Sequence, residues 1–234
     1  TVAAGVLALV AMLRIRHRPT PAVAGESMLR SLAEGLRYVR GERVIFWALT
    51  LDLFAVFFGG AIAMLPVFAT EILRVGADGF GILQAAPGIG AVLMALFLAH
   101  RRPFRHAGPV LLAAVTVFGL AMIGFALSRS YLQSVALLAL SGAADNISAV
   151  IRSVLIQVRV PAGMLGRVSS VNAIFIGSSN ELGAFESGVA ARLFGIVPSV
   201  VLGGTMTLLT VAFIAWRAPE VRRLGVIQRE HAPS

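Results

Sequence analysis

Residues 109–127 have the sequence PVLLAAVTVFGLAMIGFAL, and YLQSVALLALSGAADNISAVIRSVLI follows at residues 131–156, after the turn Ser128-Arg129-Ser130. Each stretch is apolar over about the 20 residues that a helix needs to cross the hydrocarbon core of a bilayer. A turn this short makes the two helices antiparallel neighbours. The pair therefore predicts a helical membrane protein.

Four further stretches share this length and apolar character, at about 44–73, 79–99, 168–191 and 197–216. The chain of 234 residues is 58% hydrophobic and only 13% charged, whereas soluble domains carry about 25% charged residues. Residues 1–13 are apolar but too short to span, and we expect them to be the end of a truncated transmembrane helix. The predicted fold is an all-α membrane protein, with a six-helix bundle at 44–216 and the end of a preceding helix.

The basic residues indicate how the helices are oriented. All twenty are arginine, and sixteen of them lie in alternate gaps between the apolar stretches. The other gaps hold only Arg74, Arg129 and Arg192, and Arg152 falls inside a stretch. By the positive-inside rule, the arginine-rich gaps and the tail at 217–234 are cytoplasmic. We therefore predict a multi-pass protein of the bacterial cytoplasmic membrane. Its net charge of +9 reflects topology and attraction to lipid headgroups, and we expect no nucleic-acid partner.

The gap at 14–43 is the only long one. We expect residues 17–27 to form an extended linker, because Pro19 and Pro21 resist helix formation. Residues 27–40 are amphipathic: one face holds Met28, Leu29, Leu32, Leu36 and Val39, and the other holds Arg30, Ser31, Glu34, Arg37 and Arg40. Arg30 and Glu34 are spaced to form an ion pair. The segment is either a helix on the cytoplasmic membrane surface or a helix docked on the protein.

Polar side chains inside the spans are the functional candidates, because a charged group at the bilayer centre usually faces an interior or a water-filled cavity. Asp52 begins a face of small or polar residues that continues as Val56, Gly59, Ala63, Pro66 and Thr70. Asp145 belongs to a stripe formed by Ser134, Leu138, Ser141, Asp145, Ser148 and Arg152. Asp145 and Arg152 are about 10 Å apart along the helix axis, too far for a direct pair. We expect Asp145 to find a partner on another helix or in water, and Arg152 to extend towards the cytoplasm.

The span at 168–191 is the most polar. One side holds Ser169, Asn172, Ser179, Gly183, Glu186 and Ser187, and Glu181 lies elsewhere, near Gly177 and Gly188, where helices can approach closely. In the span at 79–99, a face of small residues from Gly81 to Ala95 favours helix packing over substrate contact. The full set of candidates for substrate binding or proton coupling is Asp52, Asp145, Glu181, Asn146, Asn172, Asn180 and Arg152. For each acid, structural hydrogen bonding is the alternative role.

Several enzyme classes are excluded by residue types. The chain has no lysine, so a P-loop NTPase and a retinal Schiff base are ruled out. The four histidines, His17, His100, His106 and His231, lie in predicted cytoplasmic gaps or in the tail, so a Ser–His protease has no histidine at membrane depth. The chain contains no cysteine, and its sequence shows no metal-binding cluster. We predict a protein that is not an enzyme and that has no cofactor or metal site.

The segment at 141–188, SGAADNISAVIRSVLIQVRVPAGMLGRVSSVNAIFIGSSNELGAFESG, is similar to the C-terminal half of major facilitator superfamily transporters. It most resembles the group formed by the enterobactin exporter and related siderophore and macrolide efflux proteins. This resemblance implies that the six spans are helices seven to twelve and that 14–43 is the central cytoplasmic loop. It also implies that helices seven and ten, which carry Asp52 and Asp145, line a central cavity. The loop 100–108, HRRPFRHAG, matches a cytoplasmic gating loop with Arg101, Arg102 and Arg105, but it lacks the acidic residue expected before it.

The predicted function is part of a secondary active transporter that exports a small molecule, such as a siderophore or a lipophilic drug, by proton-coupled alternating access. Its expected partners are membrane lipid, the substrate, protons and an N-terminal half of the same transporter. That half is either part of the same chain or a separate protein. The alternative is a membrane receptor or accessory module that transports nothing.

Overall fold

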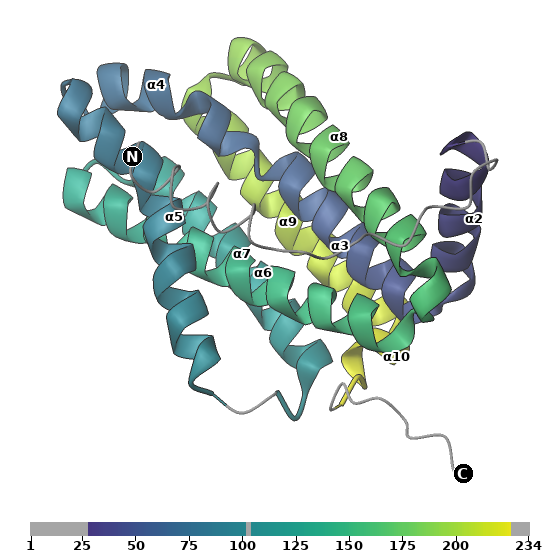
Figure 1. The fold of residues 1–234 in the computed structure, drawn as a ribbon. Coiled ribbons are helices and arrows are strands. Elements are labelled where there is room, and N and C mark those ends of the chain that lie inside the picture. The colour runs from purple at the N-terminus through teal and green to yellow at the C-terminus, as the bar shows by residue number, and fades with distance from the viewer. Residues whose placement is uncertain (1–27, 102–103, 226–234) are drawn as a thin grey trace, which may run out of the picture.

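The computed structural model describes residues 28–101 and 104–225, which form helices and short turns (Figure 1). The first span begins as α3 (Arg43–Phe58), after the helix α2 (Met28–Gly41). It continues through the 3₁₀ turn η1 (Gly60–Met64), the short helix α4 (Leu65–Val67) and the π-helical turn η2 (Phe68–Ile72). The remaining helices are α5 (Ala77–Ala99), α6 (Ala107–Leu127), α7 (Tyr131–Arg159), α8 (Ala162–Phe194), α9 (Ile196–Arg217) and α10 (Pro219–Arg222).

Five of the predicted spans have the length and composition needed to cross a membrane: the segment Arg43–Ile72, α5, α6, α7 and α9. The sixth, 168–191, lies within α8, which at 33 residues is the longest helix described. α8 is about 50 Å long, but it is not among the helices whose composition suits a membrane crossing, and it carries Arg167, Glu181 and Glu186. The structure thus confirms an all-α, multi-pass membrane protein.

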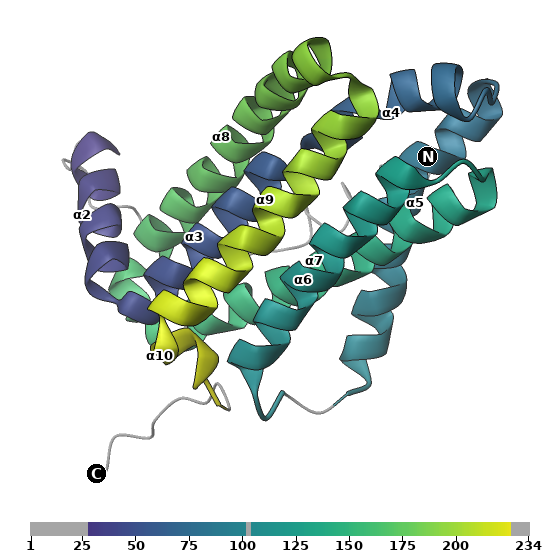
Figure 2. The ribbon, with the colours of Figure 1, turned by 180° about the vertical axis from the view of Figure 1, so that it is seen from behind.

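The helices lie side by side in one oblique bundle (Figures 1 and 2). α7 packs on α5 and α6, α6 packs on α9, and α3 packs on α8 and α9. α2 and α10 lie at one end of the bundle, which we call the α10 end, and α4 lies at the opposite end, the α4 end. Each end has its own apolar core, with Ile45, Leu111 and Val221 at the α10 end, and Phe68, Phe125 and Leu138 at the α4 end.

The first span is not the single helix predicted at 44–73. α3 ends at Phe58, before Gly59 and Gly60, and the backbone tightens into a 3₁₀ turn. Glycine is a poor helix former, and Pro66 has no N–H to continue the hydrogen-bond ladder. Beyond η1 the helix widens, so that the Leu73 N–H bonds to the Phe68 carbonyl at 2.9 Å. The face that starts at Asp52 therefore does not continue to Thr70.

α5 and α7 pack unusually closely, and two glycines make this possible. A Cβ atom on Gly142 would lie 1.9 Å from the Pro87 carbonyl oxygen, and one on Gly90 would lie 1.8 Å from the Ala139 carbonyl oxygen. The predicted packing face of α5 is therefore wrong for contacts inside this chain: Gly81 and Gly88 are exposed. The residues that α5 buries are Leu83, Ala86 and Gly90.

α2 is docked on the protein. A Cβ on Gly35 would lie 2.8 Å from the Arg167 carbonyl oxygen, so the α2 and α8 backbones are almost in contact. The Arg167 guanidinium donates to Glu34 at 2.7 Å, and the Tyr38 hydroxyl donates to the Arg159 carbonyl at 3.0 Å. The predicted pair between Arg30 and Glu34 is also present, at 3.5 Å.

The start of the tail closes the α10 end. The Gly108 N–H donates to the Leu224 carbonyl at 3.0 Å, so the tail satisfies a free N–H at the beginning of α6. Arg43 donates to Glu220 at 3.3 Å. The backbone N–H of Glu220 itself and then Arg43 lower the pKa of the Glu220 carboxyl. The predicted helix end at 1–13, the linker at 17–27, Arg102 and the rest of the tail lie outside the described residues, so the domain boundaries stay predictions.

Candidate functional site

A buried ion pair joins α3 to α7. The Arg152 guanidinium donates to Asp52 Oδ2 at 2.5 Å, and its Nε donates to Ser148 Oγ at 3.4 Å. Each charged side chain is only 6% exposed. The prediction that Arg152 extends towards the cytoplasm is therefore wrong. A guanidinium needs no contact with water where a carboxylate and a hydroxyl compensate its charge inside the protein.

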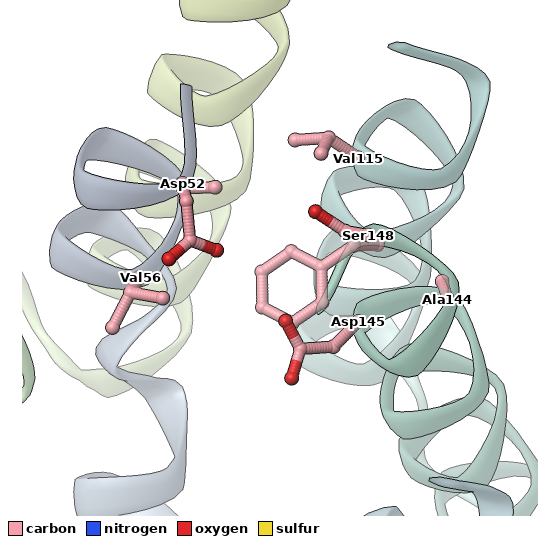
Figure 3. Close-up of a pocket in the computed structure, with 8 residues that line it drawn as sticks. Asp52, Val56, Val115, Ala144, Asp145 and Ser148 are labelled. Atoms are coloured by element: carbon pink, nitrogen blue, oxygen red, sulfur yellow. The ribbon is translucent and has the colours of Figure 1, made fainter. Parts of the chain in front are cut away.

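Asp145 faces this pair across a small cavity. Asp52 lies on one wall, while Asp145 and Ser148 lie on the facing wall (Figure 3). The cavity is lined by Asp52, Ala55, Val56, Val115, Phe118, Ala144, Asp145 and Ser148, and its volume is about 10 Å³. This is close to the space that one water molecule requires. The site thus brings together two acids and one base from α3 and α7.

The three charged residues are not equally engaged. Asp52 and Arg152 form the pair, whereas the Asp145 carboxylate makes no hydrogen bond or ion pair within the described part of the chain. Asp145 is also exposed at the open edge of the cavity. As predicted, Asp145 does not pair with Arg152, but the partner expected on another helix is not found among the described residues. Asp145 is therefore the unpaired one of the two carboxylates that line this cavity.

A second and larger cavity lies between α7 and α8. Its volume is about 370 Å³, and it is lined by Ser153, Ile156, Gln157, Leu165, Ser169 and Asn172. Pockets that hold small molecules have volumes of about 300–1,000 Å³. All four polar lining residues are uncharged, and Asn172 Oδ1 is buried without a hydrogen-bond partner. This cavity therefore offers hydrogen bonds to a neutral ligand.

Sequence reasoning identified Asn172 and Ser169 but missed Ser153 and Gln157. These two residues lie just after Arg152 on α7 and are four positions apart from each other, which places them on one helical face. That spacing was the available signal. Their proximity to α8 depends on how the two helices pack, which the spacing does not give.

The polar side of α8 serves mainly for packing. Ser179, Gly183 and Ser187 are buried, and a Cβ on Gly183 would lie 2.5 Å from the Phe57 carbonyl oxygen. The close approach expected at Gly177 and Gly188 is not found among the described residues, because a Cβ at either position meets no described atom within 4 Å.

The other candidates lie apart from the ion pair. Glu181 and Asn180 are exposed on α8. Asn146 Oδ1 is buried without a hydrogen-bond partner, but Asn146 does not line the cavity beside Asp145. The structure therefore joins Asp52, Asp145 and Arg152 into one site and leaves Glu181, Asn180 and Asn146 outside it.

The predicted gating loop is described only in part. The Arg101 guanidinium lies 4.7 Å from the centre of the Phe97 ring, a cation–π contact. Arg105 is exposed. Neither arginine has a carboxylate partner among the residues that the structure describes. This agrees with the absence of an acidic residue before the loop, and the gating role remains a prediction.

Long apolar helices around an interior ion pair are the architecture of a polytopic membrane transporter. Residues 2–234 match the family of transmembrane secretion effectors, within the major facilitator superfamily, and the chain belongs to this family. It is 26% identical over 222 residues to the enterobactin exporter EntS of Shigella flexneri. The alignment covers 93% of this chain and 51% of the exporter, so the chain spans about half the length of this relative. The predicted family is confirmed, and it is a family of transporters, not enzymes.

Proposed function

We propose that this chain forms part of a secondary active transporter of the bacterial inner membrane that exports a small molecule in exchange for protons. Alternating access, in which one half of the protein rocks against the other, is the mechanism. The half that complements this chain is the N-terminal half of the same transporter. One observation carries the proposal: Asp145, an acid without a partner among the described residues, faces the buried pair of Asp52 and Arg152.

The proton acts by changing the charge that faces the pair of Asp52 and Arg152. When Asp145 is protonated, it is neutral and leaves Arg152 bound to Asp52. When Asp145 is ionised, the site holds two negative charges and one positive charge, and the Asp145 carboxylate repels Asp52 and attracts the guanidinium across the cavity. This weakens the pair that holds α3 and α7 together. Proton uptake and release at Asp145 thereby bias the two packings of the bundle.

The substrate is proposed to occupy the cavity between α7 and α8. The hydroxyl and amide groups that line this cavity both donate and accept hydrogen bonds. A siderophore or a lipophilic drug with amide or hydroxyl groups requires such partners. Ser153 follows Arg152 directly on α7, and Gln157 lies about one turn further. Any rotation of α7 that accompanies the weakening of the pair between Asp52 and Arg152 also moves this wall of the cavity. The same helix therefore couples the proton site to the substrate site.

The test uses the complete transporter in inverted membrane vesicles with a pH-sensitive dye. Enterobactin and a neutral, fluorescent lipophilic drug that carries amide groups serve as the two probe substrates. We expect Asp145→Asn to abolish substrate-stimulated proton movement, because an amide cannot exchange a proton. We expect Asp52→Asn to abolish coupled export as well, because Arg152 loses its partner. Asn172→Ala should weaken substrate affinity while leaving proton coupling intact.

The matched control is Glu71→Gln, which removes an exposed carboxyl in η2, outside the site. This variant should transport at the wild-type rate. Membrane insertion of every variant is checked by its amount in purified membranes. Wild-type proton-coupled export in both Asp52→Asn and Asp145→Asn would refute the proposed proton site. Transport of neither probe by the wild-type protein would refute the proposed substrate class.

A further inference from the structure

α2 has two apolar faces, and only one of them packs against the part of the protein that the structure describes. Val39 is 1% exposed, and Gly35 and Val39 together form the face packed against the bundle. Leu29 is 79% exposed and Leu36 is 47% exposed. Leu29, Ala33, Leu36 and Arg40 follow the spacing of one helical face, so a second stripe runs along the outer side of α2. The amphipathic face predicted from the sequence is therefore split in two.

Exposed arginines flank this outer stripe. Arg40 is the last residue of the stripe, and Arg37 lies beside it, directly after Leu36 in the sequence. Both arginines are exposed. Arg30 lies close by and carries its ion pair to Glu34 with its side chain 72% exposed. A helix with exposed leucines beside exposed arginines fits the boundary between lipid headgroups and acyl chains. The charge is complementary to anionic headgroups and not to a basic partner.

An aromatic cluster shows where this boundary lies. Near the start of α3, the Trp47 ring contacts the Phe213 ring of α9, with their centroids 6.4 Å apart. Phe213 in turn contacts Trp216, which is 76% exposed. Tryptophan is enriched at the level of the headgroups in membrane proteins. α2 ends at Gly41, only a short turn before α3, and both views show it at this end of the bundle (Figures 1 and 2).

We propose that the outer face of α2 binds the anionic phospholipid of the membrane leaflet at the α10 end. Leu29 and Leu36 insert among the upper acyl chains, and Arg37 and Arg40 bind headgroup phosphates. The inner face stays on the protein through Gly35 and the pair between Arg167 and Glu34. α2 is thus a strap between the lipid surface and the beginning of α8. This lipid-binding surface shares no residue with the proposed proton and substrate sites, so the two proposals stand or fall independently.

The test exploits the absence of cysteine from this chain. Ala33→Cys places a single thiol in the exposed stripe, and the full protein is labelled there with an environment-sensitive fluorophore. The labelled protein is reconstituted in phosphatidylcholine alone and in phosphatidylcholine mixed with increasing phosphatidylglycerol. We expect the emission to shift to shorter wavelength as phosphatidylglycerol increases, and high salt to reverse the shift.

The variants separate charge on α2 from charge elsewhere. Each arginine near an anionic surface strengthens binding by about fivefold, so Arg37→Gln with Arg40→Gln should remove most of the emission shift across the phosphatidylglycerol series. Arg37→Lys with Arg40→Lys should keep the wild-type response. Arg222→Gln with Arg223→Gln removes the same charge from exposed positions in and just after α10 and should also leave it unchanged.

Each other outcome overturns the proposal. An emission spectrum that is the same in both lipids shows that α2 does not sense anionic headgroups. A wild-type response in Arg37→Gln with Arg40→Gln shows that these arginines do not bind them. Emission at short wavelength in every lipid, independent of the arginines, shows that another protein segment covers the stripe. Circular dichroism verifies that each variant keeps its helical content.

Discussion

The positive charge of Arg152 has two hydrogen-bond partners, the Asp52 carboxylate on α3 and the Ser148 hydroxyl one turn earlier on its own helix. Removing one partner of a buried pair leaves the other charge without compensation, which typically lowers the free energy of unfolding by about 3–5 kcal/mol. Removing both charges leaves two neutral groups that can still form a hydrogen bond. The pair therefore makes a clear prediction about stability that does not depend on transport.

We expect Arg152→Gln alone to lower the free energy of unfolding by about 3–5 kcal/mol, and the double variant Arg152→Gln with Asp52→Asn to recover most of that loss. Unfolding in mixed detergent micelles, followed by tryptophan fluorescence, measures both. Ser148→Ala is the milder comparison, since it removes only the hydrogen bond of 3.4 Å. If the double variant is as unstable as the sum of the two single variants, Asp52 and Arg152 do not compensate each other.

The sequence revealed Asp52, Asp145 and Arg152 because charged residues inside apolar stretches are rare and expensive. It did not reveal the pair, because Asp52 and Arg152 are separated by 100 residues and meet only through the packing of α3 and α7. Helical periodicity correctly predicted that Asp145 and Arg152 do not pair directly. It could not distinguish an arginine that reaches water from one that reaches a neighbouring helix.

At the scale of elements, the seam between α5 and α7 depends on two reciprocal glycines. Gly142 of α7 meets the backbone at Pro87, and Gly90 of α5 meets the backbone at Ala139. Small residues at such crossings allow the close contact that drives helix association in membranes. Backbone atoms cannot move aside as a flexible side chain can, so a methyl group at either glycine forces the helices apart.

We expect Gly142→Ala to lower the free energy of unfolding by about 1–3 kcal/mol, the usual range for overpacking. Gly177→Ala is the matched control: it also lies within a helix, but its added Cβ meets no atom within 4 Å. That control should be neutral or slightly stabilising, since alanine is the better helix former. Thermal unfolding of both variants in the same detergent decides the question, and equal stability would show that the seam tolerates a methyl group.

Helix lengths were predictable from apolar length and short polar turns, and α5, α6 and α9 begin and end within a few residues of the expected limits. Helix faces were less predictable. On α8, small and polar residues occur on several sides, so the sequence did not distinguish the face that packs at Gly183 from the positions of Gly177 and Gly188, where an added Cβ meets no atom within 4 Å. The end of α3 at Phe58 is explained by Gly59, Gly60 and Pro66, which are all visible in the sequence. The prediction of one helix over 44–73 relied only on the length of the apolar stretch.

Across the whole molecule, the fold gathers the arginine-rich gaps at one end. The turn between α7 and α8 meets α2 there, where Arg159 donates to Glu42 at 3.0 Å and Arg167 donates to Glu34. The loop before α6 reaches the same end through the bond from Gly108 to Leu224. At the other end, the Tyr131 hydroxyl donates to the Gly79 carbonyl at 3.3 Å, which joins the sparsely charged turns. The alternation of charge along the chain thus predicted which gaps share an end of the bundle.

This arrangement predicts the orientation of the protein in the membrane. The α10 end, which holds most of the arginines, should face the cytoplasm, because the membrane retains positive loops on that side.

Gly76 lies exposed at the α4 end and Gly163 at the α10 end, and a Cβ at either position meets no atom within 4 Å. Single cysteines at these positions, in a chain without other cysteines, therefore report the two ends without disturbing the fold. We expect a membrane-impermeant maleimide added to intact cells to label Gly76→Cys and not Gly163→Cys, which should become reactive only after permeabilisation. Labelling of Gly163→Cys alone in intact cells would invert the topology and place the strap of α2 on the outer leaflet, whereas labelling of both would show that the two positions do not lie on opposite sides.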